Sequence, residues 1–154
     1  MIIRSATLAD VQAVLDMSAD FYASTPFKEW GPMDREQVES LVLGMIKDHI
    51  LLVAEVDGKV IGMAGLLLIP FMFNPEVKHA SEVVWYIDPS YESKGVGIAL
   101  LKSMEEEARD RGAEIISMMA LSTSPPVASK AYKAMGYTET ETMYSKKLNT
   151  EENK

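Results

Sequence analysis

The stretch that most constrains the fold of this chain is residues 82–112, which reads as a strand, a glycine loop and a helix. An apolar run at 83–87 ends just before Pro89, because proline cannot donate a hydrogen bond to a neighbouring strand. Two glycines, Gly95 and Gly97, follow after a short loop. Apolar residues then recur every three to four positions, which predicts a helix with one buried face.

The start of this helix predicts an anion-binding site. The first N–H groups of a helix have no partner within it and carry partial positive charge, and glycines let a ligand approach the backbone closely. Lys94 adds a full positive charge. Neither common nucleotide loop fits, because no Lys-Ser or Lys-Thr follows Gly97, as a Walker loop requires, and Leu100 stands where a Rossmann fingerprint needs glycine or alanine.

Residues 92–97, Glu-Ser-Lys-Gly-Val-Gly, resemble the [QR]-x-x-G-x-[GA] loop of the GCN5-related N-acetyltransferase (GNAT) family. Residues 3–10, 85–91 and 128–137 are also similar to elements of that family, so the resemblance extends over the chain up to position 148. One departure is Glu92, which replaces the usual glutamine or arginine. A carboxylate beside a pyrophosphate is unfavourable unless its side chain points to solvent.

The length and the patterns predict a single acetyltransferase-like domain over residues 1–148, with a polar tail at 149–154. Strands and helices are expected in the order βααβββαβαββ. This is an α/β fold of mixed α+β type, with a central, mixed but mostly antiparallel twisted sheet flanked by helices, and it is the acyl-CoA N-acyltransferase fold of the resembled family. Specific local expectations are a capping box at 7–10, a type I′ turn at Asp57-Gly58, bulges near Gly62 and Gly65, a loop over 70–78, a strand over 114–121, and closing strands at 137–140 and 142–148.

Charge and composition narrow the function. The formal net charge of −8 argues against nucleic acid or an anionic membrane as a partner and favours a cationic acceptor. The absence of cysteine excludes a cysteine nucleophile, and two histidines make a histidine-rich metal site improbable, so no metal is expected. No export signal or membrane-length apolar run is evident, which predicts a cytoplasmic protein. The sequence leaves both a monomer and a homodimer open.

The resemblance implies acetyl-coenzyme A as the acyl donor, with coenzyme A as the product. Its pyrophosphate is expected on the backbone amides of residues 94–98, and its pantetheine arm is expected beside the end of the strand at 86–88. The expected donor-binding residues are Tyr86, Ile87, Asp88, Lys94, Gly95, Val96, Gly97 and Ile98.

Two side chains are candidates for proton transfer. Tyr132 corresponds to the family's tyrosine in the last helix and is the candidate general acid, with a packed aromatic as the alternative. Glu82 is the candidate base, since some family members use a glutamate here, and strand alternation predicts it on the same face as Val84 and Tyr86. An ordinary charge at a strand edge is the alternative for Glu82, and His79 or water could serve as the base instead.

The aromatic residues Phe27, Trp30, Phe71 and Phe73 lie in the two expected long loops and are candidates for the acceptor site, or for packing beneath those loops. The resulting hypothesis is an acetyl-CoA-dependent N-acetyltransferase. It would transfer the acetyl group directly, within a ternary complex, to a primary amine of a small molecule or a protein. The alternative is a domain that binds coenzyme A without turnover and serves as a sensor or interaction module.

Overall fold

Five strands form one sheet in the order β1-β2-β3-β4-β5 within residues 1–148, which are the residues that the structure, a computed structural model, describes. The strands are β1 (Ile2–Ser5), β2 (Ile50–Val56), β3 (Lys59–Phe71), β4 (Asn74–Ile87) and β5 (Ile115–Ser117). Neighbours pair antiparallel from β1 to β4, whereas β4 and β5 pair in parallel. The predicted mixed, mostly antiparallel α/β fold is confirmed.

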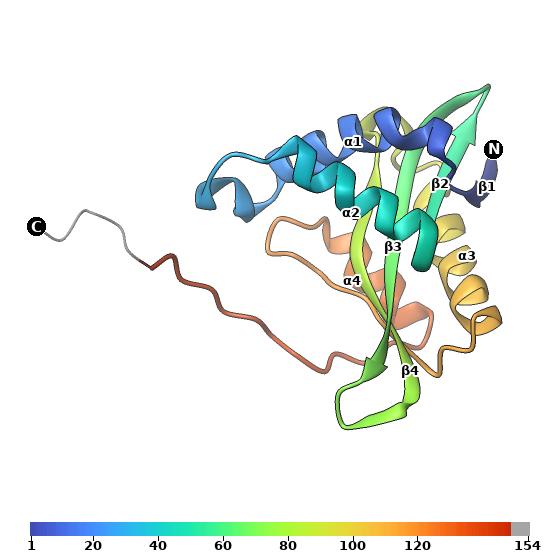
Figure 1. Ribbon diagram of the computed structural model, residues 1–154, viewed down its shortest axis with the longest axis vertical. Helices are drawn as coiled ribbons and strands as arrows, with labels where there is room; N and C mark the ends of the chain where they lie inside the picture. Colours follow the sequence, from blue (N-terminus) through green and yellow to red (C-terminus); the bar gives the residue numbers. More distant parts are fainter. Residues whose placement is uncertain (149–154) are drawn as a thin grey trace, which may run out of the picture.

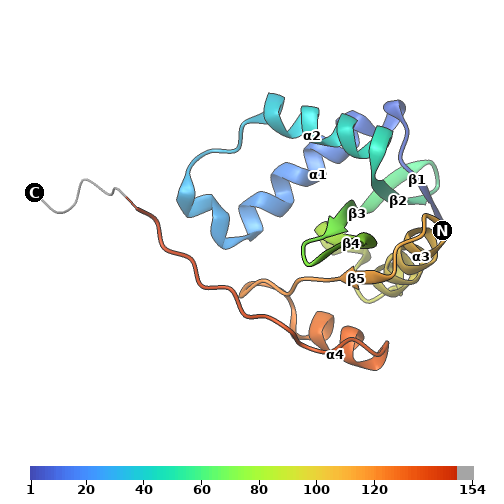
Figure 2. The same cartoon turned by 60° about the horizontal axis from the view of Figure 1, so that its bottom comes forward.

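Helices cover both faces of this sheet (Figures 1 and 2). They are α1 (Val11–Ser24), α2 (Arg35–Asp48), α3 (Val96–Asp110) and α4 (Pro126–Ala134), with short 3-10 turns η1 (Leu8–Asp10), η2 (Pro26–Trp30) and η3 (Pro89–Tyr91). The α1 and α2 helices pack on one face, over a core that includes Leu15, Met45 and Met63.

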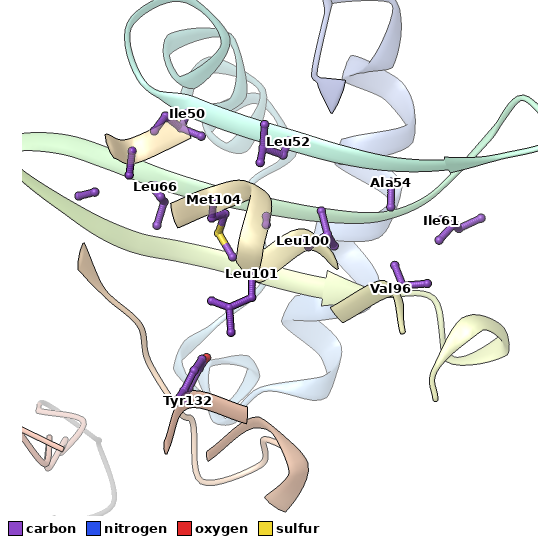
Figure 3. Close-up of a cluster of buried hydrophobic side chains, with 13 residues drawn as sticks. Ile50, Leu52, Ala54, Ile61, Leu66, Val96, Leu100, Leu101, Met104 and Tyr132 are labelled. Carbon is purple, nitrogen blue, oxygen red and sulfur yellow. The ribbon is translucent and has the colours of Figure 1, made fainter. Parts of the chain in front are cut away.

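The opposite core is formed by α3, α4 and the other face of the sheet. Leu100, Leu101 and Met104 of α3 pack there against Ile50 and Leu66 of the sheet. Figure 3 shows these side chains with Tyr132 of α4 beside the lower end of the cluster. The amphipathic pattern of α3 therefore has the predicted effect, because all of its buried positions face this core.

The opening motif, residues 3–10, joins β1 to the start of α1. Arg4 donates to both carboxylate oxygens of Asp10, at 2.8 and 2.9 Å, and its Nε donates to Glu55 of β2 at 2.9 Å. The Thr7 backbone N–H also donates to Asp10, at 2.7 Å, as the predicted capping box requires. The hydrogen bonds from Arg4 lower the pKa of Asp10 to about 2. We interpret this motif as structural.

Several turn predictions are confirmed. Asp57 and Gly58 both have positive φ, 50° and 77°, as the central residues of a type I′ turn must. Gly62 and Gly65 both adjoin register shifts, the first between β2 and β3 and the second between β3 and β4. Gly112 follows the end of α3 with φ 83°, so it occupies the left-handed position that commonly ends a helix.

The loop predicted over residues 70–78 is wrong, because β3 and β4 continue through it as a long hairpin. Pro70 lies opposite Lys78 in the ladder, and only Met72 and Phe73 form the turn. The pairing of β2 with β3 ends at Leu66, so β3 has one neighbour beyond that point. A proline is tolerated there because its missing N–H costs no hydrogen bond on the unpaired side.

The two closing strands predicted at 137–140 and 142–148 are also absent from the structure. After α4 the chain is extended but unpaired, and it runs away from the sheet (Figures 1 and 2). The predicted polar tail at 149–154 lies outside the described residues. None of the described helices is both long enough and apolar enough to cross a membrane.

Candidate active site

The sheet opens between β4 and β5, and this opening defines the candidate site. The two strands pair only through 79–81 and 115–117, although β4 continues to Ile87. The predicted strand over 114–121 is therefore wrong beyond Ser117, where the chain departs from β4 instead of continuing beside it. The edge of β4 from position 82 onward consequently has no strand beside it within the described residues.

A β-bulge on β4 determines which face Glu82 occupies. Leu66 pairs with Glu82 but Gly65 pairs with Val84, so Val83 is an extra residue. Such a residue breaks the alternation of side chains along a strand. Gly65 lies opposite the bulge, where a Cβ would lie 2.8 Å from Cε at the flexible end of Met45 and 3.2 Å from Cγ1 of Val84, so a larger residue would displace these side chains.

The prediction that Glu82 shares a face with Val84 and Tyr86 is wrong because of this bulge. Val84 and Tyr86 pack against the α1–α2 core, whereas Glu82 reaches the chain beyond β5, on the side of α4. Had the alternation continued, Glu82 would point away from Tyr132. The bulge therefore brings the candidate base and the candidate acid together.

Glu82 is 7% exposed, and its Oε2 accepts a hydrogen bond from the Met119 backbone N–H at 2.7 Å. Burial raises the pKa of the Glu82 carboxyl to about 7, although the hydrogen bond from Met119 opposes this shift. Burial disfavours the charged form because the protein interior solvates a carboxylate poorly. A carboxyl that titrates near neutrality can both accept and release a proton at physiological pH.

Tyr132, on α4, donates its hydroxyl hydrogen to the Met119 carbonyl oxygen at 2.8 Å. Glu82 and Tyr132 therefore bind the N–H and the C=O of the same residue. Burial, followed by the nearby charge of Glu82, raises the pKa of Tyr132, so its hydroxyl stays protonated. The ring also packs in the core of α3, as the alternative of a packed aromatic expects, and the role of its hydroxyl as an acid stays a prediction.

Sequence reasoning missed Met119 and the aromatic residues beside Tyr132. The ring of Trp85 lies 5.5 Å from that of Tyr132, and the ring of Tyr137 lies 5.6 Å from it on centroid distances. The Trp85 indole Nε1 is buried and has no hydrogen-bond partner in the described part of the chain. Met119 contributes only backbone atoms, so no pattern of side chains could have identified it.

The glycine loop before α3 has the form expected of an anion cradle. Gly95 has φ 78°, and a Cβ placed there would meet nothing within 4 Å, so the turn is open to an approaching group. The Ala99 N–H donates to the Gly95 carbonyl oxygen at 3.1 Å. The amides of 96–98 thus precede the first hydrogen bond of the helix and are available to a ligand. These residues fit a pyrophosphate.

Gly97 serves a different purpose. A Cβ there would lie 3.1 Å from Ile87 Cδ1 and 3.3 Å from Trp85 Cζ2, so glycine allows α3 to pack closely on the end of β4. Of the charged side chains in the loop, Lys94 lies 4.9 Å from the centroid of the Tyr91 ring, in a cation–π contact. Glu92, the departure from the family pattern, is exposed, which meets the condition for a carboxylate at that position.

The segment 86–88 borders a cavity of about 560 Å³ between α1 and the end of β4. Its lining includes four carboxylates, those of Asp10, Asp16, Asp20 and Asp88. Three of them form ion pairs: Asp10 with Arg4, Asp16 with Arg35, and Asp88 with Lys59. Asp20 forms no ion pair in residues 1–148. Burial, then the charges of Asp20 and Asp88, raise the pKa of the Tyr86 hydroxyl.

The acceptor-site candidates form two separate pairs within residues 1–148. Phe27 and Trp30 contact each other in η2 with ring centroids 5.0 Å apart, and Phe71 and Phe73 do so at the β3–β4 turn at 5.7 Å. His79, the alternative base, has its Nε2 2.8 Å from the Ser117 Oγ. In the described chain, no group of three or more His, Cys, Asp or Glu side chains is arranged to hold a metal.

The family model and the relatives described below are all acetyltransferases. A sequence model of the acetyltransferase (GNAT) family matches residues 14–137. The aminoglycoside N(6')-acetyltransferase type 1 of Klebsiella aerogenes is 35% identical in an alignment of 95 residues, and the match covers 58% of this chain and 59% of that protein. The match thus spans less than two thirds of the length of this relative.

Solved structures share the fold at low sequence identity. A ribosomal-protein-alanine N-acetyltransferase from Brucella melitensis biovar Abortus 2308 has a TM-score of 0.75 at 18% identity, covering 96% of this chain and 100% of its own. A protein from Clostridium acetobutylicum, described as a predicted acetyltransferase and solved with acetyl-CoA, has a TM-score of 0.74 at 17% identity, covering 96% of each chain.

Proposed function

The chain belongs to the acetyltransferase (GNAT) family, and we propose that it transfers an acetyl group from acetyl-CoA to a primary amine of a cationic small molecule. One observation carries the proposal. Glu82 and Tyr132 are bound to the same residue, Met119, at the place where β4 and β5 part. A group that can accept a proton and a group that retains one are thereby held together beside an unpaired strand edge.

Acetyl-CoA would supply the activated acyl group, held by the amides of 94–98 and by the end of β4 at 86–88. In the transfer a nitrogen–carbon bond forms and a carbon–sulfur bond breaks, so one proton must leave the amine and one must reach the departing sulfur. The absence of cysteine from the sequence supports direct transfer, since no thiol can carry the acyl group.

Glu82 would take the proton from the amine. Its Oε2 is fixed by the Met119 N–H, whereas its Oε1 forms no hydrogen bond within the described residues and is free to accept one. A lysine-type amine has a pKa of about 10.4 and arrives mostly protonated, so a base that is itself ionised near neutrality is needed.

Tyr132 would supply the second proton. Its raised pKa keeps the hydroxyl protonated, so the proton is present when the thiolate forms beside it. A thiolate whose thiol has a pKa of about 8.5 is a weaker base than a phenolate, so the proton moves only transiently. The hydroxyl would turn from the Met119 carbonyl oxygen to the sulfur in that step.

Two observations favour a cationic acceptor. The cavity beside Tyr86, on the α1 face of the sheet, is lined by four carboxylates and by two cations, Arg4 and Lys59, so its net charge is negative. One of these carboxylates, that of Asp20, has no ion-pair partner in the described chain. The net charge of −8 raises the local concentration of cations near the whole molecule. The relative from Klebsiella aerogenes is named for aminoglycosides, which are polyamines, and this supports the same class of acceptor.

The experiment that tests this function is a screen of amines with acetyl-CoA, in which free thiol is detected as it forms. Polyamines and aminoglycosides should give steady, amine-dependent release, whereas neutral and anionic amines of similar size should give less. Binding of acetyl-CoA with no amine-dependent thiol release for any acceptor would instead support the alternative, a sensor or interaction module without turnover.

A further inference from the structure

Three residues of β5 pair with β4, and they hold the segment that carries Met119. This pairing ends at Ser81 and Ser117, and residues 118–121 form no helix or strand. Met119 follows two positions after the last pair, and its side chain is exposed. The position of its N–H and C=O, which bind the candidate base and acid, therefore depends on how firmly the end of β5 is held.

One side-chain hydrogen bond joins β4 to β5 at this end, within the part of the chain that the structure describes. His79 Nε2 lies 2.8 Å from Ser117 Oγ. In the ladder His79 lies opposite Ile115, so its imidazole reaches two positions along β5 to the last paired residue. The ring of Phe71, from the long β3–β4 hairpin, packs edge-on against the imidazole at a centroid distance of 6.2 Å. This contact restricts the orientation of the imidazole.

This bond lies on the face of the sheet opposite the candidate acid and base. Ala80 and Ile116 pack in the core of α3. Their neighbours His79 and Ser117 therefore point to the other face, because side chains alternate along a strand. Glu82 is on the side of α4. An effect of the bond on Glu82 must consequently pass through the backbone of β5 and of the segment that follows it.

We propose that Ser117 is a positioning residue for the proposed transfer. Its hydrogen bond with His79 fixes the end of β5 and thereby the backbone of Met119. The Met119 N–H and C=O then stay in place between the candidate base and acid. The inference rests on the proposed function only for its effect on turnover, because the geometry can be measured without turnover. Since reacting groups tolerate little misplacement, a small shift of this backbone should lower the rate.

Three variants isolate the hydroxyl of Ser117. Ser117→Ala removes the hydroxyl and leaves the strand. Ser81→Ala is the matched control, because Ser81 lies opposite Ser117 in the ladder, is likewise half-buried, and has a hydroxyl that forms no hydrogen bond within residues 1–148. Ser117→Thr keeps a hydroxyl on a residue that suits a strand, so it should behave as the parent. Substitution at Ser117 also leaves His79, the alternative base, in place.

Amide hydrogen exchange at Met119 reports its hydrogen bond to Glu82 directly. In Ser117→Ala, exchange at this amide should be roughly 2- to 10-fold faster than in the parent, the range expected for loss of one hydrogen bond. Ser81→Ala and Ser117→Thr should exchange at the parental rate. Equal exchange rates at Met119 in the two alanine variants would overturn the proposal.

The Glu82 carboxyl gives a second readout without turnover. The hydrogen bond from the Met119 N–H lowers its pKa, against the effect of burial, so a looser contact should raise that pKa in Ser117→Ala. The carboxyl is titrated through its NMR chemical shift, and its signal is assigned by its absence from Glu82→Gln. An unchanged titration of Glu82 in Ser117→Ala would also contradict the proposal.

The other titratable groups near Glu82 change little over this range of pH. Tyr132 of α4 and Tyr137 after it have raised pKa values, so both hydroxyls stay neutral. Glu105 and Arg109 of α3 act on Tyr137 and carry opposite charges. His79 lies on the other face of the sheet and is present in every variant, and Ser81→Ala controls for the loss of a hydroxyl beside it.

Kinetics then tests the effect on the reaction. Ser117→Ala should lower kcat by roughly 10-fold, with the KM for acetyl-CoA nearly unchanged, because other residues are expected to bind the donor. The acid limb of its pH profile should move to higher pH together with the Glu82 carboxyl. A shifted carboxyl with the parental kcat would overturn the positioning role and leave the proposed function intact. No turnover in the parent with any amine would instead contradict the proposed function, and exchange at Met119 would still decide the geometry.

Discussion

Glu82 and Tyr132 both bind the backbone of Met119: the Glu82 carboxylate accepts a hydrogen bond from its N–H, and the Tyr132 hydroxyl donates one to its C=O. The two side chains come from β4 and α4, which are separated by about a third of the chain. Neither reaches Met119 through another side chain, so the geometry of the pair depends on a single stretch of backbone beyond β5. The effect of a substitution at either residue on catalysis should therefore be measured separately from its effect on the structure.

Replacing Tyr132 with phenylalanine should lower kcat by roughly 10- to 10⁴-fold, because the ring remains but the proton is lost. The affinity for acetyl-CoA should change little, since the amides of 94–98 are expected to bind it. Single-turnover kinetics and direct titration separate these quantities. Tyr137→Phe, the same change in the neighbouring ring, is the control and should keep nearly the parental kcat. Full kcat in Tyr132→Phe would mean that this ring is only packed.

The parent should lose activity as the pH falls through about 7, because Glu82 is a competent base only when ionised. The apparent pKa can belong jointly to Glu82 and the amine. Glu82→Gln keeps the hydrogen bond from Met119 but cannot accept a proton. The rate of this variant should therefore recover only as the pH approaches the pKa of the amine, because the amine then arrives already deprotonated. A pH profile equal to the parental one would assign the base to another group, with His79→Asn as the next variant.

The same carboxyl should make folding stability depend on pH. Its pKa is raised from 4.5 to about 7 in the folded protein, so the folded state holds this proton more tightly than the unfolded chain does. The resulting stabilisation is present below pH 4.5 and is lost as the pH rises through about 7, amounting to about 3 kcal/mol at most. Glu82→Gln should therefore gain stability relative to the parent at pH 8 but not at pH 4.

Urea unfolding of both proteins at the two pH values measures this difference. Glu106→Gln, at an exposed position on α3, is the control for removing one charge. An equal effect of the two substitutions at pH 8 would show that Glu82 is not desolvated in solution.

Acetyl-CoA at about a hundredfold excess over its Kd should raise the free energy of unfolding by about 2.7 kcal/mol. Gly95→Ala places a side chain at φ 78°, which costs about 1–2 kcal/mol and disturbs the open turn. Gly112→Ala imposes a similar strain, at φ 83°, at the other end of the same helix. Both variants should be less stable without ligand, but only Gly95→Ala should lose part of the ligand-dependent increase in calorimetry. Equal increases in the two variants would exclude the loop as the donor site.

If the acceptor is cationic, its KM should rise with ionic strength, because salt screens the attraction of an acidic surface. Asp20→Asn removes the carboxylate of the cavity that has no ion-pair partner within residues 1–148, and it should raise KM with little change in kcat. Asp48→Asn makes the same change of charge at the end of α2, outside the cavity lining. A KM independent of salt, or equal effects of the two variants, would argue against recognition in this cavity.

Local chemistry explains which parts of the fold could be predicted from the sequence. The Asp57-Gly58 turn and the end of α3 at Gly112 were predictable because each needs positive φ, a requirement that few residues meet. The strand before Pro89 and the helix after Gly95 were likewise set by residues inside the segment itself. The candidate pair, Glu82 and Tyr132, came from the resemblance to a family.

The errors arose where the outcome depends on a distant neighbour. Pro70 would end a strand that is paired on both sides. However, the pairing of β3 with β2 ends before Pro70, so the strand continues through it. The segments 137–140 and 142–148 were predicted as closing strands, but a strand also needs an edge to pair with, which the local sequence does not supply. The bond between Glu82 and Met119 joins a side chain to a backbone group 37 positions away, so no periodicity reveals it.

The extra residue in β4, Val83, determines which face of the sheet each neighbouring side chain occupies. Positions 80 and 82 belong to one side of the molecule and positions 84 and 86 to the other, because Val83 interrupts the odd–even rule once. Regular pairing of Val83 within the ladder would put Glu82 on the face of Val84 and Tyr86, away from the phenol, whereas deletion of Val83 would leave Glu82 opposite Leu66 and each side chain on its present face. The bulge, and not the chemistry of the Val83 side chain, thus determines whether Glu82 and Tyr132 lie on the same side of the sheet.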